Sequence, residues 1–479
     1  MSLHCKCHTL LLLVFACLFG VYAFSQDTLV RFQPESMYQI EEIALNGNKV
    51  TKDFIIYREL EFTTGVSLSG ESLNVRVNES RENLLNTALF NFVTISFISF
   101  DKKEGVVSGK ILIDVIERWY IWPNPIFEFA DRNFNAWLQE KDFTRINYGM
   151  FLTWDNFRGR KEKLIMLTRF GYDEKYDLFY EIPYINKKKT LGLGIGFGFS
   201  QGHEIAVRSV NDTLDYIKLE NGYPSRELSS ALQLIYRPDI RNTHTFQLGF
   251  NQFIINDTVF QVNPLFSINQ NKTPRYFSLY YKYKSDFRDF VAYPLHGYYF
   301  DVVMQKYGLG ILNGNVNVFT LQTTFRKYWE LADRLYFASM LTAQFSSDHE
   351  IPYFIQSGMG YGRFFVRGYE YYVIDGQKFS LSRSNLKFAV VPTRVGNIGF
   401  IPTERFSKIH YAIYLNAFFD AGYVGDDQYE GFNELPDELL YGYGLGLDFV
   451  TYYDVVFRFE FSLNRQQESG FFIHFMAPI

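Results

Sequence analysis

Cysteine is nearly absent from this chain, and the few cysteines present lie close to its beginning. The 479 residues include only three, Cys5, Cys7 and Cys17. Everything after residue 17 therefore lacks the thiols needed for a disulfide, a thiolate nucleophile or a cysteine-bound metal. Whatever holds the rest of the chain together must be non-covalent.

Two further absences exclude large classes of protein. Positive charge is not in excess, since the net charge is −5 and the pI is about 6.0, and a nucleic-acid-binding protein needs a clustered basic face. After the first 26 residues no run of 18 apolar residues occurs, so a bundle of membrane-spanning helices is not expected. The sequence predicts no nucleic-acid partner.

Residues 1–26 have the pattern of a signal peptide. Lys6 and His8 form a polar start, residues 10–24 are apolar, and Ala23 or Ser25 could precede cleavage. Cys17 is a poor candidate for lipid attachment because Phe15 and the apolar residues after it do not fit such a site. Export without a spanning helix leaves the periplasm, the outer membrane or secretion.

Aromatic residues are abundant, at 19% of the chain with 50 Phe and 35 Tyr. A membrane β-barrel needs such residues on its lipid-facing surface and at both membrane interfaces. Apolar and polar residues also alternate, most clearly over residues 246–251 and 455–464. Residues 121–479 are long enough for 16 strands, so we expect a mainly β protein with a 16-stranded antiparallel transmembrane β-barrel.

A small α/β module is expected before the barrel, at residues 38–120, after a linker over residues 27–37. The pattern predicts the order β-α-α-β-β, with Thr51 as the cap of a helix that runs to Leu60. Three stretches resemble a POTRA domain, the periplasmic module of outer-membrane assembly and secretion proteins. They are Gly47-Asn48 with Thr51 and Arg58-Glu59-Leu60, Leu84-Leu85-Asn86-Thr87-Ala88-Leu89-Phe90, and Val115-Ile116-Glu117-Arg118. A generic small α/β domain is the alternative.

Three motifs in the barrel region extend this resemblance. They are Asp286-Phe287-Arg288-Asp289 with Pro294 and Gly297, the segment Gly358–Tyr369 ending in Val366-Arg367-Gly368-Tyr369, and Phe418-Phe419-Asp420-Ala421-Gly422. With the POTRA-like module they make the chain resemble the BamA/TamA-type outer-membrane protein assembly factor superfamily. Two features depart from the family pattern: the chain has one POTRA-like module, and it ends in Ile479 instead of an aromatic residue.

The resemblance implies a site inside the barrel. The loop that carries Arg367 should fold back into the lumen, where Arg367 would meet Asp420 of a late strand. Alternation places Asp420 on the same face of its strand as Asn416 and Gly422, and the resemblance makes Phe418, Asp420 and Gly422 the lumen partners of the loop. An arginine can bind a carboxylate through two hydrogen bonds. The alternative is that Arg367 is a solvated loop charge.

The resemblance also implies that the first and last strands close the barrel through a weak seam, where a client strand could pair. The predicted seam residues are Trp122, Phe127, Phe129, Phe472, His474 and Met476.

The expected function is therefore outer-membrane protein assembly, with the POTRA-like domain in the periplasm. Partners would be outer-membrane lipids, unfolded β-barrel or β-rich secreted client proteins, and accessory lipoproteins. The alternative is a dedicated secretion translocator of the two-partner type. No cofactor and no metal are expected.

Enzymatic activity is not expected either. Gly198-Phe199-Ser200-Gln201-Gly202 fits the nucleophile-elbow pattern but lacks the helix that this turn requires. Asp348-His349-Glu350 lacks the histidine spacing of a zinc site.

Overall fold

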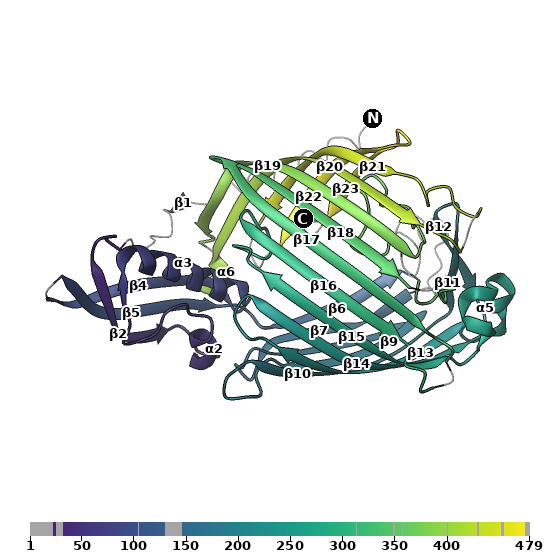
Figure 1. The fold of residues 1–479 in the computed structure, drawn as a ribbon, viewed down its shortest axis with the longest axis horizontal. Coiled ribbons are helices and arrows are strands. Elements are labelled where there is room, and N and C mark those ends of the chain that lie inside the picture. The colour runs from purple at the N-terminus through teal and green to yellow at the C-terminus, as the bar shows by residue number, and fades with distance from the viewer. Residues whose placement is uncertain are drawn as a thin grey trace.

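The computed structural model describes residues 23–24, 32–103, 105–129, 146–312, 314–347, 350–356, 358–399, 401–428, 431–451 and 455–474. A small α/β module lies at one end of a large antiparallel barrel (Figure 1). Within this part of the chain, no helix is both long enough and apolar enough to cross a bilayer.

The module is a four-stranded sheet with two helices. Its elements are β2 (Met37–Asn46), α2 (Asp53–Tyr57), β3 (Ser67–Ser69), α3 (Gly70–Asn86), β4 (Phe90–Lys103) and β5 (Val106–Glu117). The strand order is β3-β2-β5-β4, with β2 and β5 parallel. Strand β2 begins at Met37, inside the segment expected as linker, and the short strand β3 is not evident from the sequence.

Helix α3 shows why the module folds as it does. The hydroxyl of Ser69 accepts a hydrogen bond from the Ser72 amide at 3.2 Å, which caps the first turn. Leu73, Val77 and Leu84 fall on one face of the helix and are buried against the sheet. The spacing of these apolar residues in the sequence predicts a helix over residues 71–87, and helix α3 confirms it.

The prediction that Thr51 caps the first helix is wrong. Helix α2 begins after Lys52, which makes no side-chain capping bond, and the helix ends at Tyr57, before Leu60. The Thr51 hydroxyl instead lies 3.0 Å from the hydroxyl of Tyr120 and accepts a hydrogen bond from Asn156 at 2.9 Å. Thr51 therefore joins the module to the barrel.

The barrel strands follow the chain order, and each is antiparallel to the next. They are β6 (Ile121–Phe129), β7 (Ile146–Phe157), β8 (Glu162–Gly171), β9 (Asp173–Ile182), β10 (Leu191–Gly202), β13 (Ser225–Tyr236), β14 (Asn242–Ile255), β15 (Arg275–Asp286), β16 (Gly297–Tyr307), β17 (Val318–Ala332), β18 (Leu335–Ser346), β19 (Lys378–Asn397), β20 (Lys408–Gly425), β21 (Leu440–Val450), β22 (Val456–Asn464) and β23 (Ser469–His474). The strand order places β23 next to β6. The two-residue β1 (Ala23–Phe24) is a seventeenth strand of this sheet and pairs with β19.

Alternation divides the barrel into an apolar outside and a polar inside. On β22, Phe459 and Phe461 are exposed while Arg458, Glu460 and Ser462 are buried in the lumen. This is the division that a membrane barrel needs, because its outer surface faces lipid and its interior can be polar. The 16-stranded barrel expected from the sequence is confirmed.

One strand is much longer than expected. The sequence predicts a strand over residues 385–392, whereas β19 runs over 20 residues, Lys378–Asn397. Its first half alternates serine with Phe379, Leu381 and Arg383, a composition typical of a loop. Arg383 and Asn385 are nevertheless buried in the lumen, where their polarity is acceptable because the interior of such barrels is polar.

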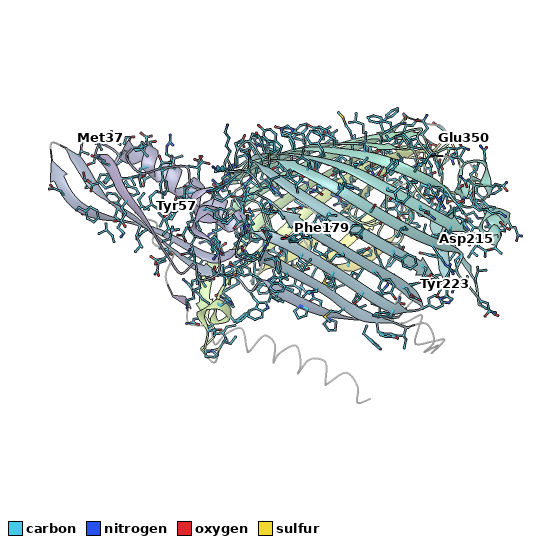
Figure 2. All side chains as sticks on the ribbon, turned by 90° about the horizontal axis from the view of Figure 1, so that it is seen from below. Met37, Tyr57, Phe179, Asp215, Tyr223 and Glu350 are labelled. Atoms are coloured by element: carbon cyan, nitrogen blue, oxygen red, sulfur yellow. The ribbon has the colours of Figure 1, made fainter. Side chains whose placement is uncertain are left out.

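The connections differ between the two ends of the barrel. Short turns and helix α6 (Glu404–Ser407) lie beside the module. Longer connections at the other end carry β11 (Glu204–Val210), β12 (Thr213–Lys218), α5 (Asp257–Val262), η1 (Pro264–Phe266) and η2 (Ile268–Gln270). Figure 2 shows Met37 and Tyr57 on the module and Asp215, Tyr223 and Glu350 at the opposite end. Val207, Val259, Phe266 and Tyr353 form an apolar cluster among these longer connections.

Candidate functional site: the Arg367 loop in the barrel lumen

The loop between β18 and β19 places Arg367 at the centre of a buried ionic cluster. Its Nε and Nη2 atoms donate to the two carboxylate oxygens of Asp420 on β20 at 2.7 and 2.6 Å. Its backbone amide donates to the same carboxylate at 3.2 Å. Both side chains are 0% exposed. The structure thus brings together the two residues that the sequence pairs, in the two-bond geometry of an arginine–carboxylate pair.

A second carboxylate and an aromatic ring complete the surroundings of this arginine. The remaining Nη1 atom donates to Asn385 on β19 at 2.9 Å and to Glu460 on β22 at 3.0 Å. The guanidinium carbon also lies 3.9 Å from the centroid of the Phe418 ring, within the range of a cation–π contact. Arg367 therefore binds three different strands at once, which fixes the tip of the loop against one wall of the lumen.

Two more arginines balance the charge of the cluster. Arg383 lies 3.6 Å from Asp420 and donates to the carbonyl oxygens of Arg363 and Phe365 in the loop. Arg458 binds both oxygens of Asp448 on β21, at 2.5 and 2.6 Å, and lies 3.6 Å from Glu460. A buried charge is tolerated when its partners compensate its lost hydration, and here cations and carboxylates alternate along the wall.

The loop approaches the wall so closely that glycine is required at specific positions. Gly368 has φ +97°, a backbone conformation that side chains disfavour. Across the contact, a Cβ atom on Gly422 would lie 2.7 Å from a methyl carbon of Val366. A Cβ atom on Gly442 would lie 1.8 Å from the carbonyl oxygen of Arg367, which is backbone and cannot rotate away.

Gly442→Ala is therefore expected to displace the loop from the wall, at a cost of about 1–3 kcal/mol or more in the free energy of unfolding. Protease cleavage within the loop and the denaturant midpoint of the purified protein measure the effect. Gly399→Ala is the matched control, because no atom lies within 4 Å of the added methyl group. Equal behaviour of the two variants would contradict the close approach.

The residues after the glycine fasten the loop to the β22–β23 turn. Tyr369 is buried and donates from its hydroxyl to Gln466 at 2.5 Å. Tyr372 donates to Glu468 at 2.8 Å. Asn464 donates to the carbonyl oxygen of Gly368 at 3.0 Å. All four residues of the predicted motif, Val366 to Tyr369, thus contact the wall of the barrel.

The described predicted residues of the last strand, Phe472 and His474, share one face of β23. On β23, Phe471 and Ile473 are exposed outward, whereas Phe472 and His474 are partly buried on the lumen side. Phe127 of β6 is exposed, and Trp122 donates from its indole to the carbonyl oxygen of Trp119 at 3.1 Å. The Phe129 side chain and Met476 lie outside the described residues.

His474 ties the last strand to the loop cluster. Its Nε2 atom lies 3.2 Å from Glu460 and 3.8 Å from Glu370, the residue that follows Tyr369. Its ring stacks on Phe365 of the same loop, with centroids 5.9 Å apart. The last strand and the loop therefore share the carboxylate that also binds Arg367.

A second buried ion pair joins the module to the barrel. Glu59 of the module is 1% exposed and accepts two hydrogen bonds from Arg237, in the β13–β14 turn, at 2.7 and 2.8 Å. Arg237 also donates to the Tyr184 hydroxyl at 2.7 Å, and Lys161 lies 3.7 Å from Glu59. Burial alone would raise the pKa of Glu59, but Lys161 and Arg237 lower it from 4.5 to about 2.

Docking of the module is therefore expected to weaken in acid. Released Glu59 would have its ordinary pKa of 4.5, against about 2 when docked. The lowered pKa contributes about 3 kcal/mol of docking free energy above pH 4.5, and this contribution is lost as the pH falls towards 2. Distances between spin labels on module and barrel at pH 7, 4.5 and 3 measure it. Glu59→Gln should remove this pH dependence, and an unchanged dependence in that variant would contradict the assignment.

Several of these residues were missed by sequence reasoning. Asn385 and Glu460 lie on the polar parity of their strands, so alternation marks them as lumen residues without naming their partners. Arg383 shares its parity with Phe379 and Leu381, so alternation does not mark it. Glu59 lies within the quoted Arg58-Glu59-Leu60 stretch, but nothing in the sequence connects it to Arg237.

The nucleophile-elbow and metal patterns of the sequence can be placed in the structure in part. Ser200 lies within the continuous strand β10, paired with Lys175 and Glu227 on either side, so no nucleophile elbow forms there. No group of three or more metal-ligating side chains occurs among the described residues. Asp348 and His349 lie outside that part of the chain.

Two solved structures have a similar fold. The structure is similar to BamA from Haemophilus ducreyi lacking POTRA domains 1–3, with TM-score 0.50, 16% identity, and coverage of 91% of this chain and 83% of that one. It is also similar to CdiB from Escherichia coli, with TM-score 0.53, 14% identity, and coverage of 95% and 78%. A search of curated proteins gives no match.

At such identities these likenesses describe the fold alone. The family is established by sequence, because the Omp85 superfamily domain matches residues 156–468, well over half of the chain. Omp85 β-barrels reside in the outer membrane and take part in protein assembly or translocation. The chain belongs to the Omp85 superfamily.

Proposed function

We propose that this protein is an outer-membrane assembly factor that inserts β-rich client proteins. In this proposal residues 1–26 are a signal peptide, the module at residues 38–120 is a POTRA-like domain in the periplasm, and the barrel lies in the outer membrane. Clients would pair with the edge of the module sheet and with the seam between the first and last strands of the barrel. The work needs no cofactor, because folding of the client in the membrane drives it.

The observation that carries this proposal is the edge of the module sheet at β4; apart from β5, no described strand pairs with it. Strand β4 lies at the end of the sheet order and pairs with β5 over its length. Its other side offers backbone N–H and C=O groups that an extended chain can bind. Ile98 and Phe100, near its far end, are exposed, the latter at 56%. Exposed apolar side chains beside an unpaired edge suit an unfolded β-rich client.

The loop inside the barrel and the docked module also support assembly. The Arg367 loop is buried against the lumen wall, and the module is held on the turns at the other opening by the Glu59–Arg237 pair. A passive pore needs neither feature. A client that pairs with strand edges does not need to pass through the lumen, so a loop folded into the lumen is compatible with assembly.

Depletion of the protein tests this function. The outer-membrane proteome and the culture supernatant are quantified before and after depletion. Assembly predicts that many unrelated β-barrels are lost from the membrane. Loss of one secreted protein from the supernatant, with the membrane proteome unchanged, would contradict assembly and identify a dedicated translocator.

A variant of the edge strand tests where clients bind. Phe100→Lys places a charge at the edge of β4, which disfavours strand pairing, and it should reduce complementation of the depleted strain. Val75→Lys is the matched control, since Val75 is similarly exposed but lies on helix α3. Equal complementation by both variants would exclude this part of β4 as the client site.

A further inference from the structure

The connection between β15 and β16, residues 287–296, contacts both the module and the lumen cluster. Tyr293 extends from it into the barrel, where its side chain is buried. Its hydroxyl donates to Asp448 at 2.6 Å, and its ring packs on Tyr414 with centroids 4.8 Å apart. The ammonium group of Lys387 lies 4.3 Å from the centroid of the same ring. The Tyr293 hydroxyl thus forms a hydrogen bond to the buried ionic cluster, and it reaches the cluster from the end of the barrel where the module lies.

Asp448 continues directly to the loop. It is bound through both oxygens by Arg458, which lies 3.6 Å from the same Glu460 oxygen that Arg367 binds at 3.0 Å. Asp448, Arg458 and Glu460 are all buried. The path from Tyr293 to Arg367 therefore consists of three charged side chains in succession, each in contact with the next and shielded from water.

The same connection also holds the module. Asn86, the last residue of helix α3, donates to the carbonyl oxygen of Asp289 at 2.9 Å and accepts from the amide of Val291 at 3.0 Å. These two bonds engage a peptide segment only two residues before Tyr293. Movement of the module would thus pull on the segment that positions the Tyr293 hydroxyl.

We propose that Tyr293 is a positioning residue that couples the placement of the module to the seating of the Arg367 loop. Release of the module would withdraw Tyr293 from Asp448, and Arg458 would lose part of the arrangement that holds Glu460 against Arg367. Contacting polar side chains of this kind can transmit a change between distant sites. This inference rests on the proposed function. In an assembly factor, arrival of a client at the module would loosen the loop.

A cysteine reporter at Val366 makes the seating of the loop measurable without any client. Val366 is 1% exposed, so a thiol introduced by Val366→Cys should react with a maleimide only when the loop lifts. The native cysteines are all at or before residue 17 and are replaced by serine. The full chain is purified in detergent, and the barrel fold of each variant is checked by heat-modifiable electrophoretic mobility.

Tyr293→Phe should raise the labelling rate about tenfold, the effect of losing one hydrogen bond to a charged group. Asn86→Ala should raise it in the same direction. The decisive result is the double variant: it should label no faster than Tyr293→Phe alone, because coupled residues deviate from additivity. An unchanged rate in Tyr293→Phe, or single effects that multiply in the double variant, would overturn the proposal.

Two controls isolate the coupling. Tyr336→Phe removes a hydroxyl from the same apolar cluster as Tyr293 and should leave labelling unchanged. Asn78→Ala alters an exposed residue of the same helix as Asn86 and should also have no effect. Client insertion by the same variants is measured separately, so failure of the coupling and failure of the assembly function give different results.

Discussion

Replacement of Arg367 by alanine is expected to lower the free energy of unfolding by about 3–5 kcal/mol, the usual cost of leaving buried charges without their partner. Asp420 and Glu460 would remain in the lumen, 0% and 1% exposed, without the guanidinium that binds both. Urea unfolding of the purified protein, followed by tryptophan fluorescence, measures the loss. Protease cleavage between β18 and β19 should increase at the same time, because the loop would leave the wall.

Arg465→Ala is the matched control for this variant. Arg465 forms an ion pair of the same length, 2.6 Å to Glu438, but both side chains are largely exposed. Exposed pairs contribute at most about 1 kcal/mol. If Arg367→Ala lowers the free energy of unfolding no more than Arg465→Ala does, the anchoring role of Arg367 is contradicted.

Exchange of the two charges tests the pairing itself. Combining Arg367→Asp with Asp420→Arg should recover part of the stability lost by either single variant. Recovery would be incomplete, because the carboxylate introduced at position 367 would face Glu460. A double variant no better than the single variants would exclude a direct pair.

The second large effect is expected at the junction of module and barrel. Arg237→Ala leaves Glu59 buried without its two-bond partner, which should weaken docking by about 3–5 kcal/mol. Spin labels on Val75→Cys and Lys187→Cys, one on the module and one on a barrel turn, report docking as a distance. The distance distribution should be narrow in the parent protein and broad in Arg237→Ala.

Lys188→Ala serves as the control for this experiment. Lys188 is an exposed cation in the turn between β9 and β10, so its removal changes the net charge by the same amount as Arg237→Ala. It should leave the distance distribution narrow. Broadening in Lys188→Ala equal to that in Arg237→Ala would show that net charge, and not the buried pair, determines docking.

The strands were predictable because a membrane barrel separates lipid-facing and lumen-facing residues with a period of two. That rule locates β22 from its alternating phenylalanines and places Asp420 on the lumen parity of β20. It fails for the first half of β19, where Arg383 is buried in the lumen beside Phe379 and Leu381, and the serines that alternate with them lie on the opposite face of the strand. Alternation also does not distinguish a lumen side chain that is hydrated from one that is buried and paired.

The partners within the site were less predictable for a different reason. Family resemblance pairs Arg367 with Asp420, but the contact with Glu460 joins residues 93 positions apart, and the Glu59–Arg237 contact spans 178 positions. Only the folding of the loop back into the lumen and the docking of the module bring these residues together. Thr51 shows the same limit: local sequence favours a helix cap, whereas the fold uses its hydroxyl between module and barrel.

Reconstitution in lipid vesicles tests the proposed assembly function. The purified protein is placed in lipid vesicles, and the folding of a urea-unfolded β-barrel client into these vesicles is followed over time. We expect faster insertion than into empty vesicles, with the acceleration reduced by Arg367→Ala and retained by Arg465→Ala. Equal insertion rates with and without the protein would contradict the proposed assembly function.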